Sequence, residues 1–267
     1  MPKPKQKLQK LKKILHYYPG VVVAFSGGVD STLLLKVARD VLNEKVVAVT
    51  AVSQLYPESE INQAKKIARL LKIKHLIIHS DELKNSDFVR NPENRCYYCK
   101  IELFKNLKAI AKEYDYVVLE GSNYSDLKDF RPGMAAAKKM NIRSPLVEAK
   151  LTKAEIRSLA KRLRLPNWNK PSMACLASRI PYGVKINRKI LKRIEEAEEI
   201  LRNLIFSQFR VRDYFPLARI EILQDEFKKI FRYRNQIIRL FKKIGYKYIT
   251  LDIEGYRTGS MNNEKFL

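Results

Sequence analysis

Residues 21–37, Val-Val-Val-Ala-Phe-Ser-Gly-Gly-Val-Asp-Ser-Thr-Leu-Leu-Leu-Lys-Val, predict a buried strand, a tight glycine turn and a helix in direct succession. The turn, Ser26–Ser31, would point backbone N–H groups and the positive end of the helix at one spot, which suits a phosphate. Gly27 and Gly28 allow close approach and unusual backbone angles. The sequence therefore predicts a phosphate-binding loop between a strand and a helix.

Side chains of this loop add to the predicted site. Ser26 and Ser31 carry hydroxyl donors, and Asp30 can hold a magnesium ion. No lysine follows the glycines, so the loop is not a Walker P-loop. The alternative is a tight strand-to-helix turn that binds no ligand.

Strand and helix patterns alternate through the first two thirds of the chain, which predicts a parallel sheet covered by helices on both faces. Ligands of such sheets bind at the carboxyl ends of the strands. Three segments follow strands and should share that edge: Ser26–Ser31, Thr50–Ser53 and Gly121–Asp126. The expected strands are 21–25, 46–52, 76–79 and 116–119. Helices are expected over 31–43, from near Pro57 onward, and over 102–114. A further helix should begin at the Thr152–Glu155 capping box and end at about Leu165.

The composition changes near Tyr182-Gly183, and the chain after it predicts a small α+β domain. We therefore expect an α/β domain over residues 1–184 and a second domain over residues 185–267. The second should contain helices 188–205 and 227–244 and strands near 217–223 and 248–253. The basic N-terminus, Met1–Lys13, is expected to be a frayed or mobile arm, or else to continue into a helix over 8–15.

The chain has 267 residues, of which 46% are hydrophobic, and a net charge of +25. No apolar stretch approaches the roughly 20 residues of a membrane span, and the Lys-rich N-terminus lacks the apolar region of a secretory signal. A soluble cytoplasmic protein without membrane partners is expected. The excess charge would attract RNA, nucleotides or other phosphorylated partners, or it forms a solvated surface; both interpretations stay open.

The three cysteines are Cys96, Cys99 and Cys175, an odd number that argues against a disulfide framework. Cys96 and Cys99 have the C-x-x-C spacing that aims two thiols at one metal, although zinc and redox sites share it. Three thiolates without an obvious fourth ligand suit a [4Fe–4S] cluster with one open iron, which can hold an external ligand such as hydrosulfide. Taken alone, Cys175 could equally be a small buried residue. The only histidines, none with ligand-like spacing to a cysteine, are His16, His75 and His79.

Several motifs together carry a family resemblance. The loop Ser26–Ser31 resembles the pyrophosphate loop (PP-loop) of enzymes that split ATP into AMP and pyrophosphate. With residues 94–100 and 170–183, the chain resembles the LarE family of ATP-dependent sulfur transferases, which help to build the nickel-pincer nucleotide of lactate racemase. The resemblance covers nearly the whole chain and continues through residues 121–126, 131–133, 143–146, 210–212, 218–221 and 255–260.

The resemblance implies a substrate of the pyridinium-3,5-dicarboxylate mononucleotide type. Each carboxylate would be activated as an acyl-adenylate, and sulfur would displace AMP to give a thiocarboxylate. Family members with a single cysteine, at the position of Cys175, sacrifice its sulfur and leave dehydroalanine; others carry three cysteines and a [4Fe–4S] cluster. With Cys96 and Cys99 present, this chain resembles the cluster-dependent type, so sacrifice of Cys175 is the alternative.

The resemblance also implies roles for individual residues and partners. Ser178 and Arg179 would line the reaction site beside Cys175. A sulfide donor and a homo-hexamer are implied as partners. The ATP phosphates and magnesium would be bound by Ser26, Gly27, Gly28, Asp30 and Ser31. The adenine would lie against Thr50, Ala51 and Val52, and the metal or ribose would contact Asn123 and Asp126. The substrate phosphate would be bound by Arg210, Arg212 and Arg257. Local turn bonding is the alternative for Asn123 and Asp126, ordinary sheet edge for 50–52, and a solvated basic face for the arginines.

Three other functions are compatible with parts of this sequence. An iron–sulfur tRNA thiolase would also combine this loop with three cysteines, but the segments 210–212 and 255–260 favour the sulfur transferase. A nucleotide- or RNA-binding protein without chemistry would bind ATP and release no pyrophosphate. A glutamine-dependent ligase that makes NAD or GMP would need an ammonia source and have no use for three cysteines.

Overall fold

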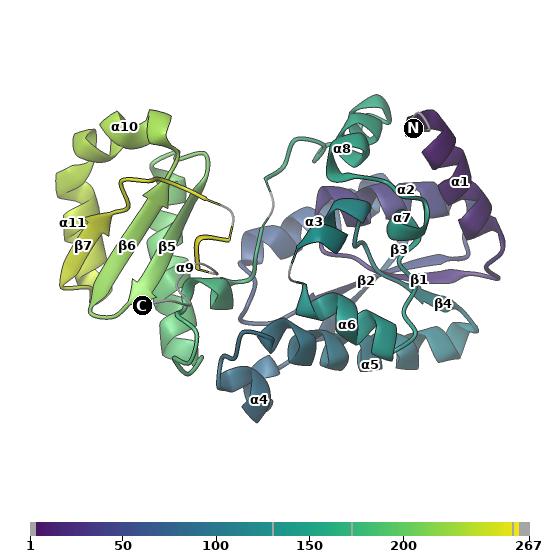
Figure 1. The fold of residues 1–267 in the computed structure, drawn as a ribbon, viewed down its shortest axis with the longest axis horizontal. Helices are drawn as coiled ribbons and strands as arrows, with labels where there is room; N and C mark the ends of the chain where they lie inside the picture. Colours follow the sequence, from purple (N-terminus) through teal and green to yellow (C-terminus); the bar gives the residue numbers. More distant parts are fainter. Residues whose placement is uncertain (1–3, 130, 172, 258, 262–267) are drawn as a thin grey trace. The chain divides into compact units, whose positions relative to one another are not determined.

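The computed structural model describes residues 4–129, 131–171, 173–257 and 259–261 (Figure 1). The chain forms two compact units. Unit 1 comprises Met1–Phe88 and Glu93–Met173, and unit 2 comprises Val89–Pro92 and Ala174–Leu267. This division falls eleven residues before the predicted domain boundary at 184/185 and gives the short segment 89–92 to unit 2.

Unit 1 is built on a parallel sheet with the strand order β3-β2-β1-β4. The strands are β1 (Val21–Ala24), β2 (Val46–Val52), β3 (Lys74–His79) and β4 (Val117–Leu119). All three pairings are parallel, as the alternation of strands and helices predicts. The carboxyl ends of the strands therefore share one edge, and the loop after β1 lies at its middle because β1 is flanked by β2 and β4.

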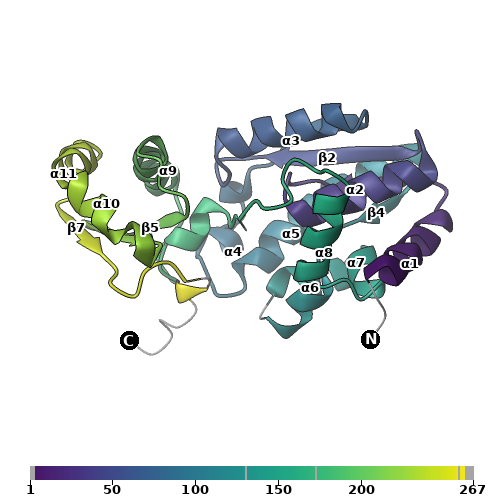
Figure 2. The same ribbon diagram turned by 90° about the horizontal axis from the view of Figure 1, so that it is seen from above.

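Helices cover both faces of this sheet (Figures 1 and 2). Val21 and Val23 of β1 pack into a cluster with α1, α2, α3 and α8, whereas Val22 packs on the other face with α5 and α6. This alternation follows the two-residue period of a strand buried on both sides. The helical elements of unit 1 are α1 (Pro4–His16), α2 (Val29–Leu42), α3 (Glu58–Leu70), η1 (Glu82–Lys84), α4 (Ser86–Val89, whose last residue belongs to unit 2), α5 (Arg95–Tyr114), η2 (Tyr124–Lys128), α6 (Pro132–Lys139), α7 (Pro145–Glu148) and α8 (Lys153–Arg162).

Unit 2 is a smaller α+β unit. Its sheet has the order β5-β6-β7, with β5 antiparallel and β7 parallel to β6. Figure 2 shows α9 and α11 on the same side of this sheet, where they pack on an apolar cluster that includes Leu201, Val211 and Phe241. The elements are η3 (Leu176–Arg179), α9 (Arg188–Asn203), β5 (Phe209–Tyr214), β6 (Leu217–Ile222), η4 (Gln224–Glu226), α10 (Phe227–Arg232), α11 (Arg234–Lys243) and β7 (Tyr248–Leu251).

The segment 89–92 belongs to unit 2 through its hydrogen bonds. The buried Asn91 donates from Nδ2 to the carbonyl of Pro181 at 2.7 Å, and its own carbonyl accepts from the N–H of Gly183. The N–H of Ile186 donates to the carbonyl of Val89. The chain therefore contributes to unit 2 before it returns to unit 1 at α5.

Several predicted elements differ in the structure. Helix α5 begins at Arg95 rather than Glu102, so both C-x-x-C cysteines lie on a helix. The frayed N-terminal arm is wrong for residues 4–13, which belong to α1. This helix buries Leu11 and Leu15 and contains the helix over 8–15 that the alternative expected. The expected single helix 227–244 is two helices, α10 and α11, and strand β5 was not predicted.

No helix among the described residues is both long enough and apolar enough to cross a membrane.

Candidate functional site

The loop between β1 and α2 takes a path that its glycines make possible. Gly27 has φ +70°, and a Cβ atom there would lie 3.2 Å from Cα of Ala64 in α3. Glycine is the residue that adopts this backbone without strain and leaves this space. Gly28 is the N-cap of α2, so the first turn of α2 opens directly onto the loop. The N–H groups and dipole of that turn favour a bound anion.

The two serines of the loop face one another across this helix start. Ser26 Oγ lies 3.3 Å from Ser31 Oγ and accepts a hydrogen bond from the N–H of Gly28 at 3.3 Å. Ser31 Oγ donates to the carbonyl of Gly28 at 3.2 Å. Gly121, after β4, approaches so closely that a Cβ atom there would lie 3.2 Å from the backbone N of Ser31. The structure thus brings together the residues that the sequence assigns to the phosphates.

Asn167, which the sequence analysis did not identify, holds the loop through two hydrogen bonds. Asn167 is 1% exposed and donates from Nδ2 to the carbonyl of Gly27 at 2.8 Å and to Thr32 Oγ1 at 2.9 Å. Its Oδ1 is buried and has no hydrogen-bond partner among the described residues. The two bonds hold the Gly27 peptide and the first turn of α2 together, over a sequence separation that no local pattern reveals.

Asp30 lies in the first turn of α2 and is contacted by two polar side chains. Lys153 Nζ forms an ion pair with Oδ2, and Asn123 Nδ2 donates to Oδ1 at 3.5 Å. Burial raises the pKa of Asp30 above its usual value, the charge of Lys153 opposes that rise, and the Asp126 carboxylate adds to it. Asp30 and Asp126 are therefore close enough to repel one another, and cations stabilise the pair.

These groups have the chemistry of a magnesium site, because magnesium prefers carboxylate and other oxygen ligands. Asp126 accepts from the N–H of Asn123 at 2.9 Å and pairs with Arg131 at 2.8 Å, and Asn123 Oδ1 accepts from the N–H of Ser125. The local turn bonding that the sequence left open is thus present. Of the two carboxylates, Asp30 lies on the first turn of α2, and its role as a magnesium ligand stays a prediction.

Residues 50–52 form the end of β2, at the same edge of the sheet. The pairing of β2 with β1 ends at Val49, whereas the pairing with β3 continues to Val52. The last three residues of β2 therefore pair with β3 and not with β1. Their backbone on the β1 side is the part that a planar base would contact. Thr50 itself is buried; its Oγ1 donates to the carbonyl of Phe25 at 2.6 Å and lies 2.8 Å from His75 Nε2.

Cys96 and Cys99 lie near the start of α5, about one turn apart, and both are free cysteines. Cys96 is exposed, and Cys99 Sγ lies 4.0 Å from Oε1 of Glu82. Glu82 is 5% exposed and accepts from Ser80 Oγ at 2.7 Å. Residues three apart on a helix share a face, so the two thiols fit two ligand positions of one metal or cluster.

The third cysteine belongs to the other unit, because Cys96 and Cys99 lie in unit 1 and Cys175 in unit 2. Within neither unit do the described residues gather three or more His, Cys, Asp or Glu side chains into a metal site. The convergence of the three thiols therefore stays a prediction.

Cys175 is the N-cap of the short helix η3 in unit 2, and Arg179 holds the turn that carries it. Arg179 Nη1 donates to the carbonyls of Ala174 and Cys175, at 2.7 and 3.0 Å, and to Ser178 Oγ at 2.9 Å. The rest of its guanidinium forms two bonds of 2.8 and 2.9 Å to Glu198. With 0% exposure, Arg179 positions the Cys175 turn rather than presenting its side chain to a ligand.

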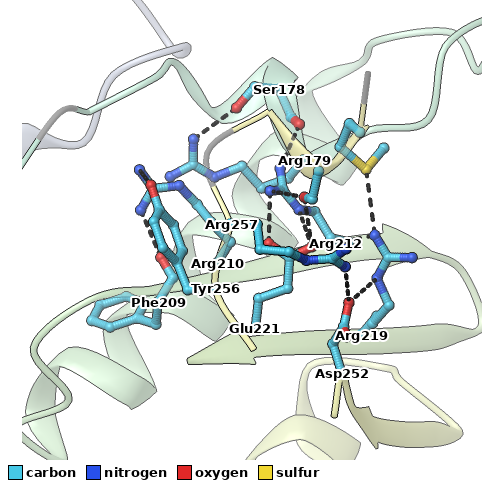
Figure 3. Close-up of polar contacts among 12 residues, drawn as sticks. Ser178, Arg179, Phe209, Arg210, Arg212, Arg219, Glu221, Asp252, Tyr256 and Arg257 are labelled. Carbon is cyan, nitrogen blue, oxygen red and sulfur yellow. Dashed lines mark hydrogen bonds and ion pairs between the residues drawn. The ribbon is translucent and has the colours of Figure 1, made fainter. Parts of the chain in front are cut away.

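Arg212 holds the same turn from β5. Its Nη1 donates to the carbonyl of Ser178 at 2.9 Å, and its Nε and Nη2 pair with Glu221 at 3.0 and 2.7 Å. Ser260 Oγ accepts from Arg212 Nη2 at 2.8 Å and donates to Glu221 Oε1. The guanidinium predicted to bind a phosphate is thus committed to protein acceptors, as Figure 3 shows.

Arg210 and Arg257 lie beside this network. Arg210 stacks on Tyr256, with 5.1 Å from the guanidinium carbon to the ring centroid. Burial lowers the pKa of Arg210, and the charge of Arg179 lowers it further. Arg257 pairs with Asp252 and is 38% exposed, so it is the most accessible of the three predicted phosphate ligands.

The sequence analysis assigned no role to four residues that complete these sites: Lys153, Asn167, Glu198 and Glu221. All are polar, and three are almost fully buried, at 1% or less exposure. Glu198 lies on the apolar face of the amphipathic helix α9, a signal that could have flagged it. For Lys153 and Asn167 the sequence carries no such signal, because their partners lie 123 and 140 residues away.

Comparisons with known proteins agree with this geometry. The sequence model of the NAD synthase family matches residues 5–128, the part of unit 1 that contains the loop. A pyridinium-3,5-bisthiocarboxylic acid mononucleotide synthase of Lactiplantibacillus plantarum is 36% identical over 245 residues, 91% of this chain and 89% of that protein.

Two uncharacterised proteins are similar over comparable lengths. One from Synechocystis sp. is 42% identical over 96% of this chain and 97% of its own length, and one from Methanocaldococcus jannaschii is 35% identical over 89% and 91%. Because the likeness to the synthase covers 91% of this chain, it extends through both units. The chain therefore belongs to the LarE family of PP-loop enzymes, the family of the pyridinium-3,5-bisthiocarboxylic acid mononucleotide synthase.

Proposed function

We propose that this protein is an ATP-dependent sulfur transferase that converts a carboxylate of a pyridinium-3,5-dicarboxylic acid mononucleotide into a thiocarboxylate. The observation that carries the proposal is the 36% identity to the bisthiocarboxylic acid mononucleotide synthase over nine tenths of both chains. The loop at the start of α2 supports the use of ATP, because its geometry suits a polyphosphate.

The first step is adenylation. A carboxylate oxygen attacks the α-phosphorus of ATP, the bond to the β-phosphate breaks, and pyrophosphate leaves. Ser26, Ser31 and the backbone from Gly27 bind the departing pyrophosphate, and Asp30 holds the magnesium that accompanies it. These groups stabilise the charge that develops on the leaving group, which is how positioned donors accelerate such a displacement.

The second step is sulfur transfer. A sulfide sulfur attacks the acyl carbon, the bond to AMP breaks, and the thiocarboxylate forms. Adenylation is needed because a free carboxylate has no good leaving group. Arg210 and Arg257 bind the substrate phosphate, and Arg212 and Arg179 position the turn of Cys175 and Ser178.

The proposal also concerns the source of the transferred sulfur. We place Cys96, Cys99 and Cys175 as ligands of a [4Fe–4S] cluster, supported by the accessible C-x-x-C pair on α5 and by the third cysteine at the arginine-held turn. With three protein ligands, such a cluster has one open iron that can hold a sulfide. The cytoplasmic location and the hexameric assembly that the resemblance implies stay predictions.

Exchange of labelled pyrophosphate into ATP tests the adenylation step. The full chain should catalyse this exchange with magnesium only when the pyridinium dicarboxylate mononucleotide is present, and Asp30→Asn should lower the rate at least tenfold. Asp40→Asn is the matched control, because Asp40 lies on the same helix and forms a solvent-exposed ion pair with Lys36. Exchange that depends on tRNA instead would support the thiolase, and absence of exchange with any carboxylate would contradict the proposal.

A further inference from the structure

Lys153 extends from the first residue of α8 to the phosphate loop, 123 residues away in the sequence. Its ammonium contacts Asp30 Oδ2 in the first turn of α2, next to Ser31. The loop itself contains no lysine, in contrast to Walker loops, where a lysine contacts the phosphates. The fold thus supplies a lysine that the local sequence lacks.

We propose that Lys153 is a nucleotide-binding residue whose ammonium contacts the β- and γ-phosphates of ATP while Asp30 holds it in place. An ammonium has three donors, so Asp30 and phosphate oxygens can share it. The side chains of Lys153 and Asp30 are 30% and 20% exposed, which leaves the contact accessible to a ligand. The inference rests on the proposed use of ATP and names the residue that completes the phosphate site.

The backbone around Lys153 is held in a way that suits a positioned ligand group. Thr152 caps α8 in a reciprocal capping box with Glu155, and the N–H of Lys153 donates to Ser125 Oγ at 3.1 Å. Lys7 of α1 pairs with Glu155 at 2.7 Å and ties the same turn to a second helix. The start of α8 is therefore fixed from three directions, and Lys153 points from it to the loop.

The other end of the α8 segment supports the same assignment. Asn167, shortly after α8, donates to the carbonyl of Gly27. Arg157, one turn along α8, adds a positive charge that lowers the pKa of Asp30. Residues 153–167 thus contact the loop at both Asp30 and Gly27 and bring positive charge toward the N-terminus of α2, where a polyphosphate would be favoured.

The competing explanation is that the Lys153–Asp30 pair only joins α8 to α2. Partly exposed ion pairs contribute little to stability, and the Lys7–Glu155 pair joins the same helix to α1. Lys7→Gln is therefore a matched control, since it removes an ion pair of the same kind from α8 without approaching the loop. A purely structural lysine predicts that the two variants behave alike.

Equilibrium binding of magnesium with a non-hydrolysable ATP analogue, and separately of AMP, distinguishes these explanations. We expect Lys153→Gln to weaken binding of the ATP analogue by about ten- to a hundredfold, as loss of a charge-assisted contact does, and to leave AMP binding unchanged. Lys7→Gln should change neither. Unchanged analogue affinity in Lys153→Gln would overturn the inference, even if the thiocarboxylate still forms and the proposed function holds.

A second measurement needs no variant. Reductive methylation of the wild-type chain with and without the magnesium–ATP analogue, read by mass spectrometry, should show protection of Lys153 and not of Lys7. Equal labelling of Lys153 under both conditions would contradict the contact. A wild-type chain that binds neither ATP nor pyrophosphate would overturn both this inference and the proposed function.

Discussion

Arg179 and Glu198 form a bidentate ion pair whose side chains are 0% and 2% exposed, and the same guanidinium donates to the carbonyl of Cys175 at 3.0 Å. Glu198 also accepts from the N–H of Val211 at 3.2 Å, which joins the pair to strand β5. A buried charge is tolerated when its partner and its remaining donors are satisfied, as they are here. The position of the Cys175 turn therefore depends on a carboxylate on α9.

Removal of that carboxylate should unfold or loosen unit 2. Glu198→Ala leaves the Arg179 charge buried without its partner, so we expect a loss of about 3–5 kcal/mol in unfolding free energy. Glu199→Ala is the control, because Glu199 is the neighbouring glutamate, half exposed, and pairs with Arg202 on the surface. Urea denaturation measures the loss, and hydrogen exchange should show faster exchange in the η3 segment. Equal stability of the two variants would show that the pair is not required.

The positive φ of Gly27 gives a second prediction. Gly27→Ala forces an L side chain to φ +70° and places Cβ 3.2 Å from Ala64, so we expect a destabilisation of about 1–3 kcal/mol and weaker ATP binding. Gly183→Ala imposes a similar strain at φ +81°, but nothing lies within 4 Å of its Cβ. That variant should lose stability and bind ATP normally. If both variants bind ATP equally, the loop does not hold the phosphates.

Asn167 provides a third test. Asn167→Ala leaves the carbonyl of Gly27 and the hydroxyl of Thr32 without their donor, which should cost about 1–3 kcal/mol and lower the affinity for ATP. Asn169→Ala, two residues along in an exposed position, should change neither quantity. Calorimetric titration with the ATP analogue and thermal unfolding of both variants give the comparison, and the account predicts a difference in both measurements.

Stability should depend on pH through Glu221. Burial raises the pKa of Glu221, but the hydrogen bond and charge of Arg212 outweigh it, so the folded-state pKa lies below the usual 4.5. A lowered pKa stabilises the fold above the unfolded-state value, and this contribution is lost as the pH falls from 4.5 through the folded-state pKa.

The Glu221→Gln variant isolates that contribution. It lacks the titrating group, so its unfolding free energy should fall less steeply as the pH decreases below 4.5. The two slopes should differ by at most one bound proton, which corresponds to about 1.4 kcal/mol per pH unit. The variant should also be less stable at neutral pH, because Arg212 loses its buried partner. Parallel slopes for the two proteins would contradict the assigned shift.

Local signals in the sequence predicted the elements that depend on neighbouring residues. The valine run before Ser26 predicts β1, and the Thr152–Glu155 pair predicts the start of α8, where the structure has a capping box. Alternation of strands and helices predicts the parallel sheet. These features follow from period, capping and turn chemistry within a few residues.

The features that were missed depend on distant partners. Strand β5 is buried along most of its length although it contains Arg210, Arg212 and Asp213. Arg212 and Asp213 pair with Glu221 and Arg193 from other elements, and Arg210 stacks on Tyr256. The start of α5 was missed although Tyr97, Ile101 and Phe104 follow one another at helical spacing and pack on the same core cluster. The contacts of Lys153 and Asn167 with the loop exist only once α8 packs on α2.

The most direct test of the central claim follows the sulfur. The anaerobically purified chain is incubated with ATP, magnesium, the pyridinium dicarboxylate mononucleotide and sulfide labelled with a heavy sulfur isotope, and both product and protein are analysed by mass spectrometry. The account predicts a labelled thiocarboxylate in excess of the enzyme, with Cys175 intact, and loss of the product in Cys96→Ala. Unlabelled product limited to one sulfur per chain, with dehydroalanine at residue 175, would contradict the cluster-dependent route, and absence of any thiocarboxylate would contradict the proposed function.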